Sequence, residues 1–226
     1  KDNLSHTVVA GFPGIGVDYT LAQFQSVLDT YKEIDASDLR SNLIAFLKEI
    51  VPVAEEAGIR MAIHPDDPPF PVLGLPRIVS TEADVQALFD AVDHPNNGLT
   101  FCTGSLGVRS DNDLPGMVKR LGHKIHFVHL RSTQWITDDM FIESDHLTGD
   151  VDMYAVIKAL LQEQQARESA GRTDVRMPMR PDHGHQMLDD LNKKTVPGYS
   201  AIGRLRGLGE LRGLTLAIRK EMALEK

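Results

Sequence analysis

The chain has 226 residues, 42% hydrophobic and 25% charged, an ordinary composition for a globular protein that buries a core. Its formal net charge of −8 disfavours binding to nucleic acid, because affinity for a phosphate backbone comes mainly from clustered cations. No apolar run approaches the roughly 20 residues that span a bilayer, and one cysteine cannot form an internal disulfide, so the sequence excludes a membrane protein and predicts a cytoplasmic one.

Helices and short apolar runs alternate in the first half of the chain. The helices are recognised by apolar residues at helical spacing, by capping residues at their starts and by turn residues at their ends. In order, the predicted elements are a helix from Ser37 and Asp38 to Gly58, a strand over Arg60–His64, a helix from Ser80-Thr81-Glu82 to the turn at 95–98, and a strand over Leu99–Cys102.

The second half continues the alternation. Residues 132–149 interrupt it with a longer segment, of a length at which loops are often functional lids, and its His146 is expected in solvent. The alternation predicts parallel strands joined by right-handed helical crossovers. In order, the predicted elements are a helix over Leu114–Leu121, a strand over Ile125–Leu130, a helix from Asp150 or Val151 to about Ser169, a strand over Val175–Arg180, and a helical tail from Ser200 to Glu225.

Each of the four predicted strands ends in a residue that can bind a metal ion. A lone buried cysteine is usually just a small hydrophobe, so no single one of these residues indicates a site. In a barrel of parallel strands, however, the strand C-termini converge on one rim, and that rim carries the active site. Two histidines, a cysteine and an aspartate suit Mn, Fe, Co or Zn better than Ca or Mg. The predicted metal ligands are His64, Cys102, His129 and Asp182.

The two-residue period of a strand sorts the side chains of the third strand between its faces. It places Ile125, Phe127, His129 and Arg131 on one face. If His129 points into a barrel, Arg131 points the same way, nearer the rim. His126 then faces the helical layer, where a structural role is expected.

Several segments of the sequence closely resemble the mannonate dehydratase family, whose members dehydrate D-mannonate in hexuronate (glucuronate) breakdown. The resemblance extends from about Gly11 to the C-terminal helix, and its run Pro178–Asp190 is long and unusual enough to be highly specific. The other matching segments are His64-Pro-Asp-Asp-Pro-Pro, 73–80, Cys102-Thr-Gly-Ser105, His129-Leu-Arg-Ser132, 149–154 and Pro197-Gly-Tyr-Ser-Ala-Ile-Gly-Arg204.

The resemblance implies a TIM-type (β/α)8 barrel and a lyase that converts D-mannonate to 2-dehydro-3-deoxy-D-gluconate and water. It implies a catalytic divalent metal, usually Mn²⁺, with Fe²⁺ or Co²⁺ as alternatives. The family's metal ligands correspond to the four strand-end residues, and its acid/base residues correspond to His183 and Tyr199, with the two roles left open. A homo-oligomer, dimeric or larger, is expected.

The expected substrate is an anion, and Arg131 is the leading candidate to pair with its carboxylate. Arg109, in a glycine-containing loop, is a second candidate. Asp66, Ser105 and His185 are candidates to bind sugar hydroxyls or to orient metal ligands, with capping or solvation as equal alternatives.

Three other interpretations remain at this point. A metal-dependent sugar isomerase would share the rim but usually favours carboxylates over a residue such as Cys102. A barrel endonuclease is disfavoured by the net charge of −8 and the lack of a basic stripe. The third is a truncated, non-catalytic dehydratase homologue.

That third interpretation arises from the length of the chain. Closure needs eight strands, and a complete barrel takes about 250 residues or more. The sequence contains about four to five barrel strands. It therefore predicts one (β/α) barrel domain over 1–226 that lacks its N-terminal strands and holds mainly the C-terminal half.

Overall fold

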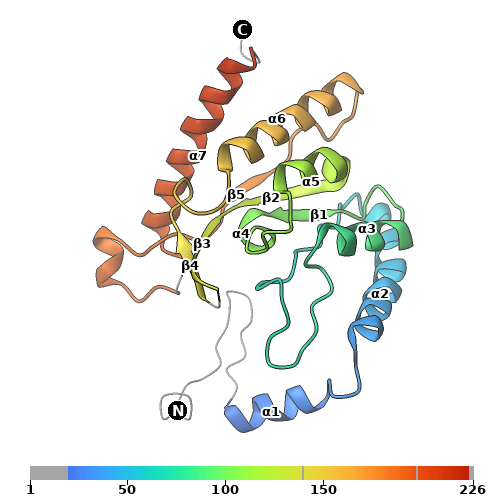
Figure 1. Cartoon of the computed structure of the whole chain (residues 1–226). Coiled ribbons are helices and arrows are strands. Elements are labelled where there is room, and N and C mark those ends of the chain that lie inside the picture. Colours follow the sequence, from blue (N-terminus) through green and yellow to red (C-terminus); the bar gives the residue numbers. More distant parts are fainter. Residues whose placement is uncertain (1–19, 139, 197, 224–226) are drawn as a thin grey trace.

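The computed structural model describes residues 20–138, 140–196 and 198–223. A parallel sheet lies at its centre, with the strands in the order β1 (Leu99–Cys102), β2 (Ile125–Leu130) and β5 (Met179–Pro181) (Figure 1). Ile63 adds a parallel bridge to Leu99 beside β1. The prediction of parallel strands is confirmed, and the bounds of β1 and β2 agree with it residue for residue.

The first and last of the four predicted strands, Arg60–His64 and Val175–Arg180, are shorter in the structure than predicted. Within 60–64, Ile63 alone bridges to a strand: its N–H donates to Gly98 and its carbonyl oxygen accepts from Thr100. The N–H of Met61 donates to Asn96, in the turn before β1. The last strand begins at Met179 rather than at Val175. Pro178 precedes it, and proline has no N–H to donate to a neighbouring strand.

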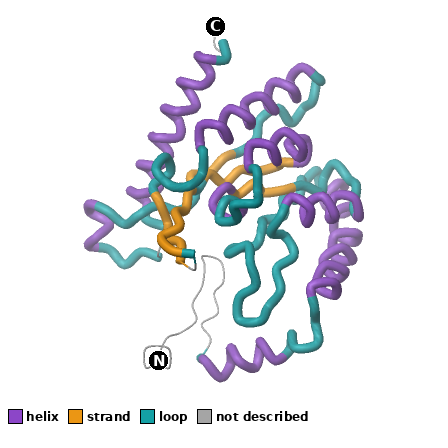
Figure 2. Tube along the Cα trace, viewed as in Figure 1, coloured by secondary structure: helices purple, strands orange, loops and turns teal. Residues whose placement is uncertain are grey.

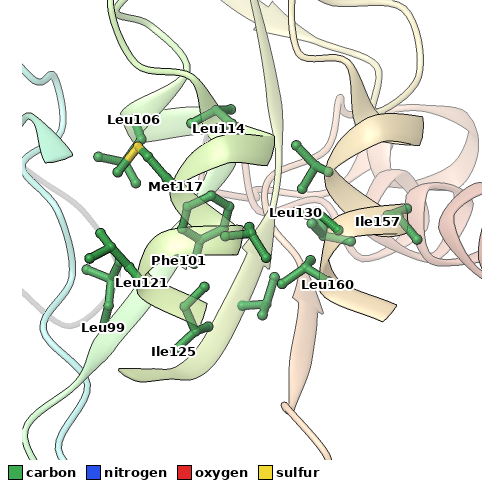
Figure 3. Close-up of a cluster of buried hydrophobic side chains, with 14 of the residues drawn as sticks. Leu99, Phe101, Leu106, Leu114, Met117, Leu121, Ile125, Leu130, Ile157 and Leu160 are labelled. Carbon is green, nitrogen blue, oxygen red and sulfur yellow. The ribbon is translucent and has the colours of Figure 1, made fainter. Parts of the chain in front are cut away.

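Helices cover one face of this sheet (Figures 1 and 2). Apolar side chains of α5 and α6 meet those of β1 and β2 in one buried cluster, in which Phe101 and Leu130 lie near Met117 and Leu160 (Figure 3). The described helices are α1 (Leu21–Asp29), α2 (Ala36–Glu56), α3 (Glu82–Ala91), α4 (Thr103–Leu106), α5 (Leu114–Leu121), α6 (Met153–Ser169) and α7 (Ala201–Glu221), with the 3-10 turns η1 (Gly122–Lys124) and η2 (Leu188–Asn192).

Side-chain caps fix where these helices begin. The Asp35 carboxylate accepts hydrogen bonds from the N–H groups of Ser37 and Asp38, so α2 begins at Ala36, just before its predicted start. The predicted start of α3 is confirmed, with Thr81 as its cap. Helix α6 is capped by Asp152 and starts slightly later than predicted, whereas α1 has no counterpart in the prediction. Among the helices that the structure describes, none is long and apolar enough to cross a membrane.

Residues 132–149 contain a β-hairpin. Its strands β3 (Ser132–Thr137) and β4 (Met140–Ser144) pair antiparallel and project from the end of β2 (Figure 1). The expectation that His146 lies in solvent is wrong, since the residue is 4% exposed. Its imidazole packs against Gly207 of α7, where any Cβ would collide with the ring, so the glycine makes room for the buried histidine.

One irregularity changes the predicted faces of β2. Leu99 pairs with Ile125, but Thr100 pairs with Phe127, so β2 has one extra residue at this point. Such a bulge exchanges the faces of the residues before and after it. Ile125 therefore belongs to the helix-covered core with Val128 and does not share a face with His129, contrary to the prediction.

Candidate metal centre and acid/base site

Three of the four predicted ligands converge at the C-terminal edge of the sheet. One ligand atom from each of His64, Cys102 and His129 lies within 4.8 Å of the other two. His64 Nε2 and His129 Nδ1 are 3.2 Å apart. These residues meet because neighbouring parallel strands end at the same edge, with Cys102 directly opposite His129 in the register.

Neighbouring groups orient two of these ligands. His64 Nδ1 lies 2.7 Å from the carbonyl oxygen of Pro65, which can only accept a hydrogen bond, so the proton resides on Nδ1 and the lone pair of Nε2 faces the other ligands. The hydroxyl of Ser105 donates to Cys102 Sγ at 3.2 Å. Ser105 thus lies behind the cysteine, in the orienting position that was one of its two predicted roles.

Asp182 lies next to His129 and is 4% exposed. Its Oδ2 is 3.5 Å from His129 Nδ1 and its Oδ1 is 2.7 Å from Arg180 Nη2. Burial raises the pKa of this carboxyl, but the neighbouring positive charges outweigh burial and hold the pKa below its ordinary value. The contact between Arg180 and Oδ1 is an ion pair that lacks the geometry of a hydrogen bond.

This donor set fits a divalent metal ion. Oδ1 of the buried Asp182 carboxylate already has the Arg180 guanidinium as its cation, whereas Oδ2 lies 3.5 Å from His129 Nδ1, beside the other candidate ligands. Two imidazole nitrogens, a sulfur and a carboxylate oxygen form a mixed set that suits a borderline transition metal.

His183 and Tyr199 form a pair beside this group. His183 Nε2 is 3.3 Å from the Tyr199 hydroxyl and 3.9 Å from Asp182 Oδ2. His183 has a φ of 59°, a left-handed conformation that costs a non-glycine residue about 1–3 kcal/mol and often occurs at functional sites. Burial, followed by the charge of Asp182, raises the pKa of Tyr199, so the phenol keeps its proton.

Glu143 is a residue of this site that the sequence reasoning missed. Its Oε2 lies 2.6 Å from His183 Nδ1, and its Oε1 accepts a hydrogen bond of 2.8 Å from Arg131 Nε. Burial raises the pKa of Glu143, but these two hydrogen bonds outweigh it and keep the carboxylate ionised. No motif marks Glu143, and the only signal was its place in the long segment 132–149.

Arg131, the leading candidate to pair with a substrate carboxylate, lies beside Glu143 and is 5% exposed. Its guanidinium already binds two carboxylates, Glu143 and Asp67, the latter at 2.5 Å from Nη1. Burial lowers the pKa of Arg131, but the two carboxylates raise it by more than burial lowers it, so the guanidinium remains a cation. The ion pairs engage Arg131 with the protein itself rather than leaving it open to a substrate carboxylate.

The remaining candidates lie around this centre or apart from it. Asp66 accepts hydrogen bonds from the N–H groups of Ile78 and Val79, which gives it a role in folding that loop. Arg109 pairs with Asp111 at the surface. His185 is exposed, and its Nε2 is 3.1 Å from the carbonyl oxygen of Glu143.

A cavity of about 800 Å³ opens beside Glu143 and His183. Its other lining residues include Arg131, His185, Gln186 and Ser200. His183 therefore borders a space large enough for a small sugar acid, whereas Tyr199 is not among the residues that line it.

Comparisons with known proteins show which proteins this chain resembles. The mannonate dehydratase of Chromohalobacter salexigens is 56% identical over 99% of this chain and 57% of its own length. The crystal structure of mannonate dehydratase from Streptococcus suis serotype 2 superposes with a TM-score of 0.78 at 35% identity, covering 88% of this chain and 55% of that one. The chain thus spans just over half the length of these relatives.

A more distant likeness concerns the fold alone. A xylose isomerase domain protein from Planctomyces limnophilus superposes with a TM-score of 0.55 at 14% identity over 82% of this chain and 55% of that one. The structure is therefore α/β and similar to xylose isomerase-like TIM barrels.

The family model described as D-mannonate dehydratase (UxuA) matches residues 1–225. Because this match covers nearly the whole chain, it shows that the protein belongs to the D-mannonate dehydratase family.

Proposed function

We propose that this chain carries the active site of a hydro-lyase that removes water from D-mannonate to give 2-dehydro-3-deoxy-D-gluconate. The observation that carries the proposal is the convergence of His64, Cys102 and His129 beside the His183–Tyr199 pair, in a chain of the D-mannonate dehydratase family. A metal centre next to two proton-exchanging groups is what a dehydration α to a carboxylate requires.

The metal ligands in this proposal are His64, Cys102, His129 and Asp182. Bound there, a divalent ion, usually Mn²⁺ in this family and otherwise Fe²⁺ or Co²⁺, supplies Lewis-acid stabilisation of the negative charge that develops next to the carboxylate. Ser105 and the carbonyl oxygen of Pro65 orient two of the ligands.

His183 and Tyr199 supply the proton transfers. Loss of the proton at C2 provides the electron pair for a C2–C3 double bond as the hydroxyl leaves C3, and the resulting enol takes a proton at C3 to become the 2-keto acid. One of the pair accepts the C2 proton and the other protonates the departing oxygen, through His183 Nε2 and the Tyr199 hydroxyl, which lie 3.3 Å apart.

The substrate carboxylate needs a cation near this pair. Arg131 was the leading candidate, but two ion pairs engage it. The side chain of Arg180 is 41% exposed and lies beside Asp182 and His129, which makes it the better placed cation.

The proposal also takes the four parallel segments as successive strands of a (β/α)8 barrel, all within one domain. Their order, their common direction and the helices on one face support this arrangement. The ligands then line the barrel mouth, where enzymes of this architecture carry their sites.

The test is turnover of D-mannonate by the full chain loaded with Mn²⁺, followed with a colour assay for 2-keto-3-deoxy acids. Tyr199→Phe is expected to retain the metal and lose activity, because it removes the hydroxyl that exchanges a proton and none of the proposed metal ligands. His129→Ala is expected to lose the metal, whereas His123→Ala, which removes an exposed imidazole, is not. Absence of turnover by the folded, metal-loaded chain would rule out the proposed function.

A further inference from the structure

Glu143 joins two residues of the site that are far apart in the sequence. One carboxylate oxygen faces His183 Nδ1 at 2.6 Å and the other accepts from Arg131 Nε at 2.8 Å. The three side chains are largely withdrawn from solvent, with exposures of 20%, 10% and 7% for Glu143, His183 and Arg131. Hydrogen bonds between charged groups are stronger in such surroundings than in water.

The β3–β4 hairpin holds Glu143 in this position. In the antiparallel register Glu143 is opposite Thr133, two residues after Arg131. The backbone oxygen of Glu143 also faces His185 Nε2 at 3.1 Å. The hairpin thus contacts the loop after β5 at His183 through a side chain and at His185 through the backbone.

Arg131 determines the orientation of Glu143. Its Nη1 pairs with Asp67 while its Nε donates to Glu143, so the guanidinium is fixed from two sides. The hydroxyl of Thr103 additionally accepts a hydrogen bond of 2.9 Å from the backbone N–H of Arg131. A planar guanidinium held in this way presents its Nε–H in one direction.

We propose that Glu143 is a positioning residue that keeps the proton of the neutral His183 ring on Nδ1, so that Nε2 is the atom through which His183 exchanges protons. A carboxylate can only accept hydrogen bonds, so the ring nitrogen that faces it must carry the hydrogen. Nε2, 3.3 Å from the Tyr199 hydroxyl, then has the lone pair. This inference rests on the proposed function in one respect, the participation of His183 in proton transfer.

Glu143→Gln separates this role from a merely structural one. The amide has the shape of the carboxylate but one donor end and one acceptor end. Because Arg131 Nε–H is a cationic donor, it selects the amide oxygen, and the NH2 group then faces His183 Nδ1. A donor at that position moves the proton of the neutral ring to Nε2 and leaves the lone pair on the wrong atom.

The direct measurement is the tautomer of His183. Two-dimensional nitrogen–proton NMR of the full chain, labelled at histidine and loaded with diamagnetic Zn²⁺, distinguishes the two tautomers at a pH where the ring is neutral. The signals of His183 are identified by their loss in His183→Gln. We expect Nδ1–H in the wild type and in Glu143→Asp, and Nε2–H in Glu143→Gln.

Kinetics with Mn²⁺ provide the second measurement. A wrong histidine tautomer lowers kcat by as much as about 10⁴-fold in enzymes with a carboxylate–histidine pair. We expect Glu143→Gln to lower kcat at least about 100-fold with KM changed less than about threefold, and Glu143→Asp to recover at least about tenfold. Glu82→Gln is the matched control, since Glu82 makes a two-pronged ion pair with Arg120 at the surface.

The outcomes separate the two proposals. If the wild-type ring carries its proton on Nε2, the positioning role is refuted, whether or not any variant folds and whether or not D-mannonate is turned over. The role is also refuted if Glu143→Gln keeps the Nδ1–H tautomer, or changes the tautomer while kcat stays at the wild-type value. A chain with the expected tautomers but no turnover refutes the proposed function and leaves the hydrogen-bond assignment intact.

Discussion

Replacing Gly203 with alanine tests how closely α7 packs against the loop that carries His183. Gly203 is buried in the first turn of α7, and a Cβ there would collide with the backbone oxygen of His185 and lie 2.9 Å from backbone atoms of Gly184 and His185. Gly213, in the same helix, is exposed and has open space where its Cβ would be. The two substitutions are chemically identical and differ only in what surrounds them.

Their effects on stability are expected to have opposite signs. Alanine in place of glycine in a helix gains at most about 1 kcal/mol. Overpacking costs about 1–3 kcal/mol, and the upper end applies to Gly203 because the obstructing atoms are backbone rather than flexible side chain. The net result is a loss of about 2 kcal/mol for Gly203→Ala and a gain of up to about 1 kcal/mol for Gly213→Ala.

Thermal unfolding by calorimetry or circular dichroism measures the difference. In a chain of this size 1 kcal/mol shifts Tm by about 2–4 °C, so Gly203→Ala should lower Tm by roughly 4–8 °C and Gly213→Ala should raise it by roughly 2–4 °C. Displacement of the loop should also weaken metal binding in Gly203→Ala alone, measured by equilibrium dialysis. Equal, positive Tm shifts for the two variants would contradict the close packing of α7 on this loop.

Three further predictions concern residues around the centre and in the core. Ser105→Ala removes the donor to Cys102 Sγ and is expected to weaken metal binding by about 10–100-fold in dialysis; an unchanged Kd would contradict its orienting role. Arg167 is buried and donates to three backbone carbonyls in addition to its ion pairs, so Arg167→Met should cost about 3–5 kcal/mol in urea unfolding; a loss no larger than that of a surface arginine variant would contradict this. The N–H of Ile202, followed by the hydroxyl of Ser200, lowers the pKa of Asp190 to about 2, so its stabilising effect is complete above about pH 4 and is lost as the pH falls towards 2. Asp190→Asn should therefore be less stable than the wild type at neutral pH, and the difference should shrink in acid; a constant difference across the pH series would refute the assignment.

The elements that were predicted correctly are those with local causes. Helix α5 begins and ends where expected because Asp113 caps its first turn and Gly122 follows its last residue. The start of α2 was missed by a small margin, since Asp35 rather than Ser37 supplies the cap. Capping residues lie within a few positions of a helix end, so the sequence alone is enough to recognise them.

The faces of β2 show where local reasoning fails. A regular two-residue period puts Ile125 with His129, and nothing in the sequence around His126 announces an extra residue. The slip between Leu99 and Thr100 arises in the pairing of two strands, so it exists only in the assembled sheet. His129 lies on the regular side of the bulge, where its pairing with Cys102 follows the regular register.

The sequence by itself determined the longer helices that cover the sheet, the central strands and the residues that converge as candidate metal ligands. A residue at the end of a strand keeps that place in any parallel sheet, so His64, Cys102 and His129 were found without knowledge of the distances between them. The tertiary structure alone decided which groups surround them. Glu143 contacts His183 because the β3–β4 hairpin folds back over the site. The same carboxylate also pairs with the guanidinium of Arg131, which the sequence analysis had assigned to a substrate carboxylate.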